Sequence, residues 1–150
     1  FGPSNDREVR LSAWLQSHYG RASWEHVLSG RGLANLYRFT CFEEGRSVPE
    51  WALGSDAPAR VVDTEPLVLS WFAELYGSEA GNMALRVMAR GGVYLAGGIA
   101  PRIVSALQAG GFRQRFESKG AVGAAIRDIP AFVITHPHLG LLGAAASWQD

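Results

Sequence analysis

Cysteine is nearly absent from this sequence, because Cys41 is the single cysteine among 150 residues. One thiol cannot build a disulfide framework or a cluster of thiolate metal ligands. Long apolar runs are also missing, and a helix that spans a membrane needs roughly 20 such residues. No signal peptide is recognisable. We therefore expect a cytoplasmic protein that does not contact a membrane.

An excess of charge is missing too, since 14 basic residues balance 14 acidic residues. The arginines are scattered among carboxylates, whereas a nucleic-acid surface gathers its basic residues in a patch or stripe. No internal repeat, low-complexity tract or domain boundary stands out, and 47% of the residues are apolar, as in ordinary globular domains. The sequence therefore predicts one globular domain with no nucleic-acid partner.

Helical periodicity dominates the beginning of the chain. Apolar residues spaced three or four apart predict a helix over residues 7–19. Ser23 is predicted to be the N-cap of a short helix. A glycine-rich turn over residues 29–32 separates that helix from another one over residues 33–42. Residues 44–57 hold several turn formers and predict a surface connection.

A long helix is predicted over residues 66–90, and two glycines interrupt its pattern. Gly77 and Gly81 would each cost roughly 1 kcal/mol relative to alanine inside a helix, unless close packing requires them. Because they are four residues apart, they lie on one face of the helix. We therefore expect another stretch of backbone to pass very near that face.

Two short apolar segments, residues 93–96 and 131–135, predict buried strands, and each leads into a glycine-containing turn and a helix. Short helices are predicted over residues 101–108, 112–116, 122–126 and 141–148. The fold class is therefore α/β, rich in helix with a small mixed sheet. Two strands are too few for the helices available, so we expect further strands upstream of this chain.

The turn formed by Gly97, Gly98 and Ile99 follows a strand and opens a helix, which is the geometry that holds nucleotides in α/β proteins. It matches neither the dinucleotide fingerprint nor the phosphate loop that carries a lysine. Tight turns of this kind are usually only turns, so the signal alone is weak.

Other candidate residues also have plain interpretations. A glutamate in the first turn of a helix, such as Glu25, ordinarily interacts with the helix dipole on a solvated face. His136 and His138 flank a turn after a predicted strand, but no third ligand is identifiable, and we predict no metal site.

Three segments together resemble the bacterial glucokinase family of the hexokinase-like and actin-like ATPase superfamily. The first is ASWEHVLSGRGLANLY at residues 22–37. The second runs from GNMAL to GGVYLAGGIAPR at residues 81–102. The third, over residues 112–145, holds two phenylalanines before Lys-Gly, then Ile-Pro and finally GLLGAA. Order and spacing agree along nearly the whole chain.

The resemblance implies that residues 1–150 form the C-terminal large domain of such a kinase, a ribonuclease H-like domain of the actin-like ATPase type, with the N-terminal domain absent. It implies a sugar-contact segment over residues 20–37, in which Glu25 hydrogen-bonds a sugar hydroxyl. It also implies a connecting helix and an adenosine turn over residues 66–102, where the glycine turn at Gly97, Gly98 and Ile99 binds the nucleotide.

The implied reaction is transfer of the γ-phosphoryl of ATP to the 6-hydroxyl of glucose, giving glucose 6-phosphate and ADP in the first step of glycolysis. The catalytic aspartate, the phosphate loops and the other sugar-site residues of the family are expected upstream of Phe1. ATP and Mg²⁺ would then be bound mainly by the missing part, and this chain alone, with no catalytic residue, should be inactive. Relatives are commonly dimers, so we expect a homodimer at full length.

Two other interpretations remain open. One is a sugar-sensing transcriptional regulator built on the same kinase fold, although the single cysteine does not allow the zinc motif of such regulators. The other is an actin-like structural ATPase, which would make filament contacts instead of binding sugar. The sequence immediately upstream distinguishes them, because a winged helix or a missing aspartate there would displace the kinase interpretation.

Overall fold

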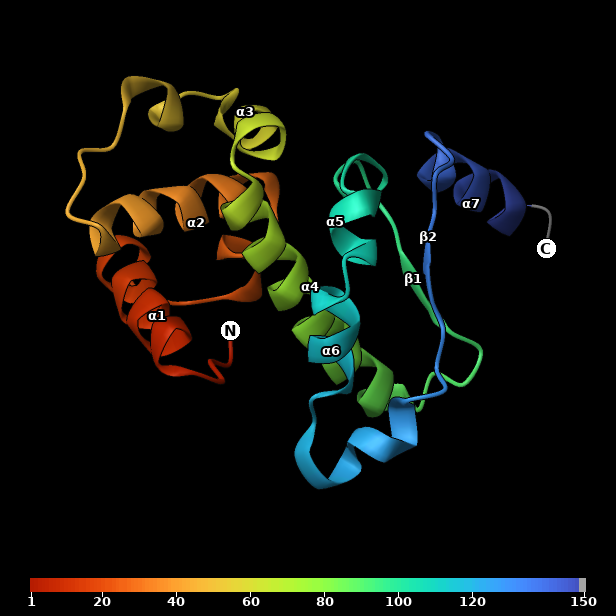
Figure 1. Cartoon of the computed structure of the whole chain (residues 1–150). Helices are drawn as coiled ribbons and strands as arrows, with labels where there is room; N and C mark the ends of the chain where they lie inside the picture. The colour runs from red at the N-terminus through yellow and green to blue at the C-terminus, as the bar shows by residue number, and fades with distance from the viewer. Residues whose placement is uncertain (149–150) are drawn as a thin grey trace.

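The computed structural model, which describes residues 1–148, is arranged on both sides of one long helix (Figure 1). This helix is α4 (Pro66–Val87), which confirms the long helix predicted from the sequence. One side holds α1 (Asp6–Tyr19), the 3-10 turn η1 (Trp24–His26), α2 (Gly30–Glu43), the 3-10 turn η2 (Glu50–Leu53) and α3 (Ala57–Thr64). The other side holds β1 (Val93–Leu95), η3 (Ala100–Arg102), α5 (Val104–Gln108), α6 (Gly111–Glu117), η4 (Gly120–Ile126), β2 (Ala131–Val133) and α7 (Leu139–Ser147).

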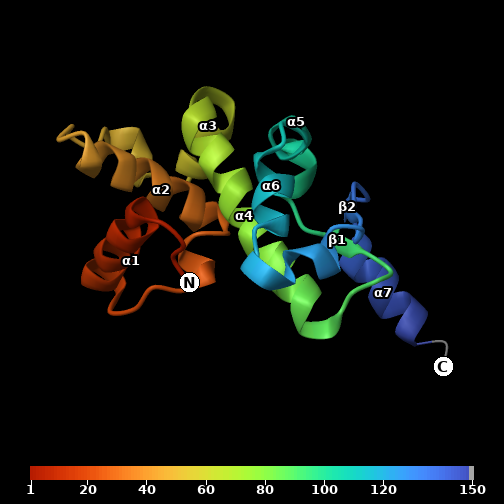
Figure 2. The same ribbon diagram turned by 60° about the horizontal axis from the view of Figure 1, so that its bottom comes forward.

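Helix α6 packs directly on the middle of α4, and both views place it there (Figures 1 and 2). A Cβ atom added at Gly77 would lie less than 3.0 Å from the backbone of Phe112, and one added at Gly81 would lie equally close to the carbonyl oxygen of Phe116. The predicted close approach of another backbone is therefore confirmed. The aliphatic end of Lys119 fills the remaining space beside Gly81.

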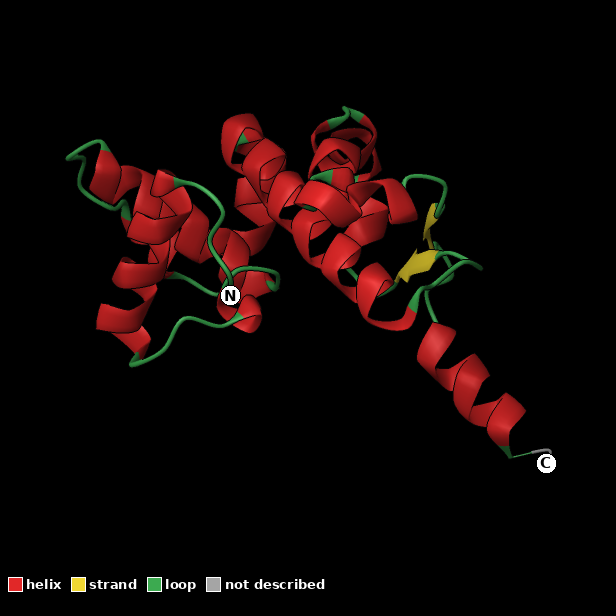
Figure 3. Ribbon diagram, turned by 90° about the horizontal axis from the view of Figure 1, so that it is seen from below, coloured by secondary structure: helices red, strands yellow, loops and turns green. Residues whose placement is uncertain are grey.

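The two strands lie at one margin of the helical body and pair in parallel (Figure 3). Val93 pairs with Ala131 and Leu95 with Val133. The helix-rich α/β class is confirmed, but the predicted mixed sheet is not found within residues 1–148, where the sheet is parallel.

The strands are less buried than their apolar sequences predict. Leu95 is buried, whereas Tyr94 and Phe132 are exposed and stack on each other with ring centroids 5.1 Å apart. Apolar runs predict burial on both faces of a sheet, but in the described structure helices cover only one. The helix that follows them, α7, contains no buried residue.

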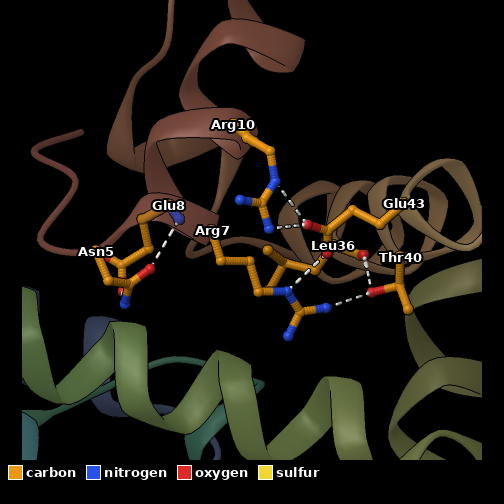
Figure 4. Close-up of polar contacts among 7 residues, drawn as sticks. All are labelled: Asn5, Arg7, Glu8, Arg10, Leu36, Thr40 and Glu43. Carbon is orange, nitrogen blue, oxygen red and sulfur yellow. Dashed lines mark hydrogen bonds and ion pairs between the residues drawn. The ribbon is translucent and has the colours of Figure 1, made fainter.

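A network of charged groups joins α1 to α2 (Figure 4). The Glu43 carboxylate accepts hydrogen bonds from Arg7 Nε at 2.7 Å and from Arg10 Nη2 at 2.8 Å. Desolvation raises the pKa of the Glu43 carboxyl, but the hydrogen bonds from Arg10 and Arg7 outweigh it, and the net shift is downward. The Arg7 guanidinium also lies 3.8 Å above the ring of Trp71 on α4.

The predicted turn over residues 29–32 is wrong, because α2 already begins at Gly30. Ser29 is its N-cap, and its side-chain oxygen accepts a hydrogen bond from the backbone N–H of Gly32 at 3.1 Å. A Cβ atom at Gly32 would lie less than 3.0 Å from the backbone of Val27. The glycine that looked like a helix breaker is therefore required for the close approach of the preceding turn, and this contact overrides its low helix propensity.

Three further expectations need correction. The short helix predicted after Ser23 is the single turn η1, and the Ser23 side chain makes no capping hydrogen bond. The predicted surface connection over residues 44–57 contains η2 and reaches α3, with Ala52 and Ala57 fully buried. The helix predicted over residues 101–108 is divided into η3 and α5.

We expect Gly77→Ala to lower the free energy of unfolding by about 1–3 kcal/mol, because the new methyl group overlaps the backbone of α6. Chemical denaturation followed by circular dichroism measures this change. Gly143→Ala in α7 is the matched control, since an added Cβ there meets nothing within 4 Å. The control should be neutral or stabilise by up to about 1 kcal/mol. Equal stability of the two variants would contradict the packing role of Gly77.

Candidate functional site

The carboxyl ends of β1 and β2 open into a cleft of about 580 Å³. Because the strands are parallel and in register, the turns that follow them leave the sheet at the same edge. One wall of the cleft comes from the turn after β1 and the other from the turn after β2. The lining residues are Ala96, Gly97, Gly98, Pro101, Thr135, His136, Pro137, Leu139 and Gly140.

The first wall presents bare backbone to the cleft. Gly97 has a φ of +103°, in the left-handed region that side chains rarely permit. A Cβ atom added at Gly97 or Gly98 would meet nothing within 4 Å, so the space beside both residues is open. Ile99 packs against the core and Ala100 is buried, which anchors the turn. The geometry therefore allows a flat ligand to approach the main chain closely.

The second wall contributes His136. The backbone N–H of His138 donates a hydrogen bond to Nδ1 of His136 at 3.1 Å. Nδ1 is thereby an acceptor, so the neutral ring carries its proton on Nε2 and can donate from there. On sequence alone the two histidines were candidates only for metal ligation, and the position of His136 in the cleft was not predicted. The sequence pattern that could have predicted this position is the pair of strands, because the turns after two parallel neighbouring strands lie at the same edge of the sheet.

Glu25 lies in η1 with its side chain exposed. The backbone around it is fixed, because Ser29 Oγ donates to the Glu25 carbonyl at 2.7 Å and Asn35 Nδ2 donates to the His26 carbonyl at 2.9 Å. The ring of Tyr19 stacks on His26 with centroids 4.6 Å apart. Within residues 1–148 the Glu25 carboxylate has neither a hydrogen-bond nor an ion-pair partner, which leaves both oxygens available to a ligand.

The structure does not bring Glu25 and the glycine turn together. The ring of Phe1 packs against Trp24 in η1 with centroids 5.0 Å apart, so η1 lies beside the N-terminus. Figure 1 places the N-terminus on one side of α4 and the two strands on the other. The two predicted contact regions therefore belong to separate parts of the surface, in keeping with different ligands or different parts of one reaction.

Among residues 1–148, no group of three or more histidine, cysteine, aspartate or glutamate side chains could hold a metal ion. The described residues therefore offer Mg²⁺ no set of three protein ligands. No described helix has the length and apolar character required to cross a bilayer.

Comparison with known proteins gives consistent matches. A family model described as Glucokinase matches residues 1–150. Glucokinases of Yersinia pestis (strain Pestoides F) and Yersinia pseudotuberculosis serotype O:1b (strain IP 31758) are each 42% identical over 150 residues, covering 97% of this chain and 46% of the relative.

A solved structure agrees with these matches. The crystal structure of glucokinase from an Antarctic psychrotroph superposes with a TM-score of 0.83 at 29% identity, over 99% of this chain and 47% of that chain. The chain thus spans about half the length of the relatives it matches. It belongs to the glucokinase family.

Proposed function

We propose that this chain is the nucleotide-side part of an enzyme that transfers the γ-phosphoryl of ATP to the 6-hydroxyl of glucose. The observation that carries the proposal is the cleft at the carboxyl ends of β1 and β2, found in a chain of the glucokinase family. A crevice at this edge of a parallel sheet is the general ligand site of open α/β folds. The domain would be of the ribonuclease H-like, actin-like ATPase type.

Adenosine is the part of ATP that suits this cleft. Gly97 and Gly98 let a planar base or a ribose lie against the main chain, and Ile99 anchors the turn from the core side. His136 on the opposite wall can donate a hydrogen bond from Nε2 to an acceptor on the nucleotide.

Glu25 suits recognition of sugar hydroxyls. An ionised carboxylate accepts hydrogen bonds at both oxygens and discriminates against ligands that lack the matching hydroxyl. The Glu25 side chain has no partner among the described residues, and its turn is held in place by hydrogen bonds, so its carboxylate is available to accept from sugar hydroxyls. Residues 20–37 would then form the sugar-contact segment, and residues 66–102 the connecting helix and the adenosine turn.

Phosphoryl transfer depends mainly on positioning and on neutralising charge. When bound, Mg²⁺ supplies charge neutralisation at the phosphates, and residues 1–148 do not offer it a ligand cluster. The catalytic base and the magnesium site would come from the remainder of the longer protein, which we propose is a cytoplasmic homodimer.

The proposal is tested by a coupled assay of ATP-dependent phosphorylation on the full-length protein, with glucose, mannose, fructose or no sugar. We expect turnover with glucose and none from the purified chain of 150 residues alone. Retained sugar binding without turnover would support the regulator on the same fold instead. Steady turnover by the purified chain would contradict the assignment of the base to the remainder.

We expect Glu25→Gln in the full-length protein to lower kcat/KM for glucose by about 10- to 100-fold, because one charge-assisted hydrogen bond is worth roughly 1.5–3 kcal/mol. The fold should be unchanged, since the carboxylate makes no hydrogen bond or ion pair with a described residue. Glu50→Gln is the matched control, because Glu50 is also exposed at the start of a 3-10 turn. Unchanged kinetics in Glu25→Gln would contradict a role of Glu25 in binding glucose.

We expect Gly98→Val to raise KM for ATP by about tenfold, because a side chain there would occupy the cleft where the nucleotide lies. KM for glucose should stay within about twofold, since Glu25 lies on the other side of α4. Gly91→Val is the control, because Gly91 is also exposed with open space beside it but does not line the cleft. Equal effects of the two variants on KM for ATP would place the nucleotide elsewhere.

A further inference from the structure

The carboxylate of Glu8 is the most completely buried charged group in the part of the chain that the structure describes, with 2% of the residue exposed. Its Oε2 accepts hydrogen bonds from the backbone N–H of Ser4 at 2.8 Å and from Ser4 Oγ at 2.9 Å. Its Oε1 accepts one from Asn5 Nδ2 at 2.9 Å. Asn5 in turn caps α1 by accepting from the Glu8 N–H (Figure 4).

The fourth donor to this carboxylate comes from a distant part of the chain. Arg115 on α6 donates from Nη2 to Glu8 Oε1 at 2.5 Å and to Ser4 Oγ at 2.6 Å. The Arg115 side chain is 19% exposed, and its buried Nε has no hydrogen-bond partner among residues 1–148. A buried ion pair of this kind contributes little net stability, because desolvation offsets the attraction. Its geometry, however, is well defined, because four donors converge on one carboxylate.

The segment that Arg115 holds leads directly to η1. Residues 1–5 run from the cluster around Glu8 to Phe1, whose ring packs edge-on against Trp24. Trp24 immediately precedes Glu25 in the sequence. A continuous path of packed groups therefore joins α6 to the turn that presents the Glu25 carboxylate.

We propose that Arg115 is a positioning residue for sugar binding, a role that rests on the function proposed above for Glu25. It fixes residues 1–5 through Ser4 and Glu8, and this segment fixes η1 through Phe1 and Trp24. Because α6 packs on the two glycines of α4, the position of Glu25 is then set relative to the rigid spine of the molecule. Without Arg115, the segment would lose the hydrogen bonds that join it to α6.

The test uses Arg115→Met and Arg115→Lys in the full-length protein. Methionine keeps an apolar stem and removes the donors, whereas lysine keeps a charge that can still reach Glu8. We expect Arg115→Met to raise KM for glucose roughly three- to tenfold, with KM for ATP unchanged, because small displacements of a binding group weaken a site strongly. Arg115→Lys should recover part of the loss.

Arg113→Met is the matched control on the same helix. Arg113 pairs with Glu117 and donates to the carbonyl of Ile129, and neither partner belongs to α1 or to residues 1–5. It should lower the stability of α6 without changing KM for glucose. A similar rise of KM for glucose in Arg115→Met and Arg113→Met would show that the effect comes from a general loss of stability, and it would overturn the proposal.

Hydrogen exchange gives a readout that does not depend on activity. The amides of His26, Val27 and Leu28 donate within η1 and just after it. We expect them to exchange several-fold faster in Arg115→Met and at the original rate in Arg113→Met. Unchanged exchange in Arg115→Met overturns the proposal, whatever the kinetics show.

A double-mutant cycle with Glu25→Gln distinguishes a failure of the positioning role of Arg115 from a failure of the sugar-binding role proposed for Glu25. If Arg115 acts through Glu25, Arg115→Met should have little further effect on KM for glucose once Glu25 is changed. Faster exchange together with an unchanged KM in Arg115→Met overturns the role in sugar binding. No effect of Glu25→Gln alone would instead be a failure of the proposed function, while the exchange data would still decide whether Arg115 holds η1.

Discussion

The close contact of α6 with α4 is the constraint on which the rest of the structure depends. Two glycines, Gly77 and Gly81, remove the side chains that would otherwise hold the helices apart, and the backbone of α6 enters the space. Helix α6 is in turn connected to both candidate contact regions. It precedes β2 in the chain, and the turn after β2 forms one wall of the cleft. It also carries Arg115, which hydrogen-bonds to Glu8 in the first turn of α1. Both candidate contact regions are therefore built on one helix pair.

The parts that could be predicted from sequence are those in which a local pattern has one physical explanation. Two glycines four residues apart inside a helix require a close neighbour, and α6 is that neighbour. A strand that ends in Gly97 and Gly98 predicts an open turn, which the positive φ of Gly97 and the empty space beside both glycines confirm. The binding roles of these residues and of Glu25 remain predictions, because contact with a ligand is not a property of local pattern.

The parts that could not be predicted depend on partners that are distant in sequence. Tyr94 and Phe132 look like core residues, because an apolar run does not reveal which face of a strand is covered. The meeting of Glu8 and Arg115 joins positions 107 residues apart, and no spacing rule connects them. In each case the deciding contact is tertiary.

The parallel ladder of β1 and β2 has a consequence for any ligand of the cleft. It joins only three pairs of residues, from Val93 with Ala131 to Leu95 with Val133, and a sheet of two strands is marginal by itself. A ligand that contacts the turns after both strands would hold the carboxyl ends of β1 and β2 together. Because such a ligand would bind the paired strands better than separated ones, its binding and the pairing of β1 with β2 would stabilise each other.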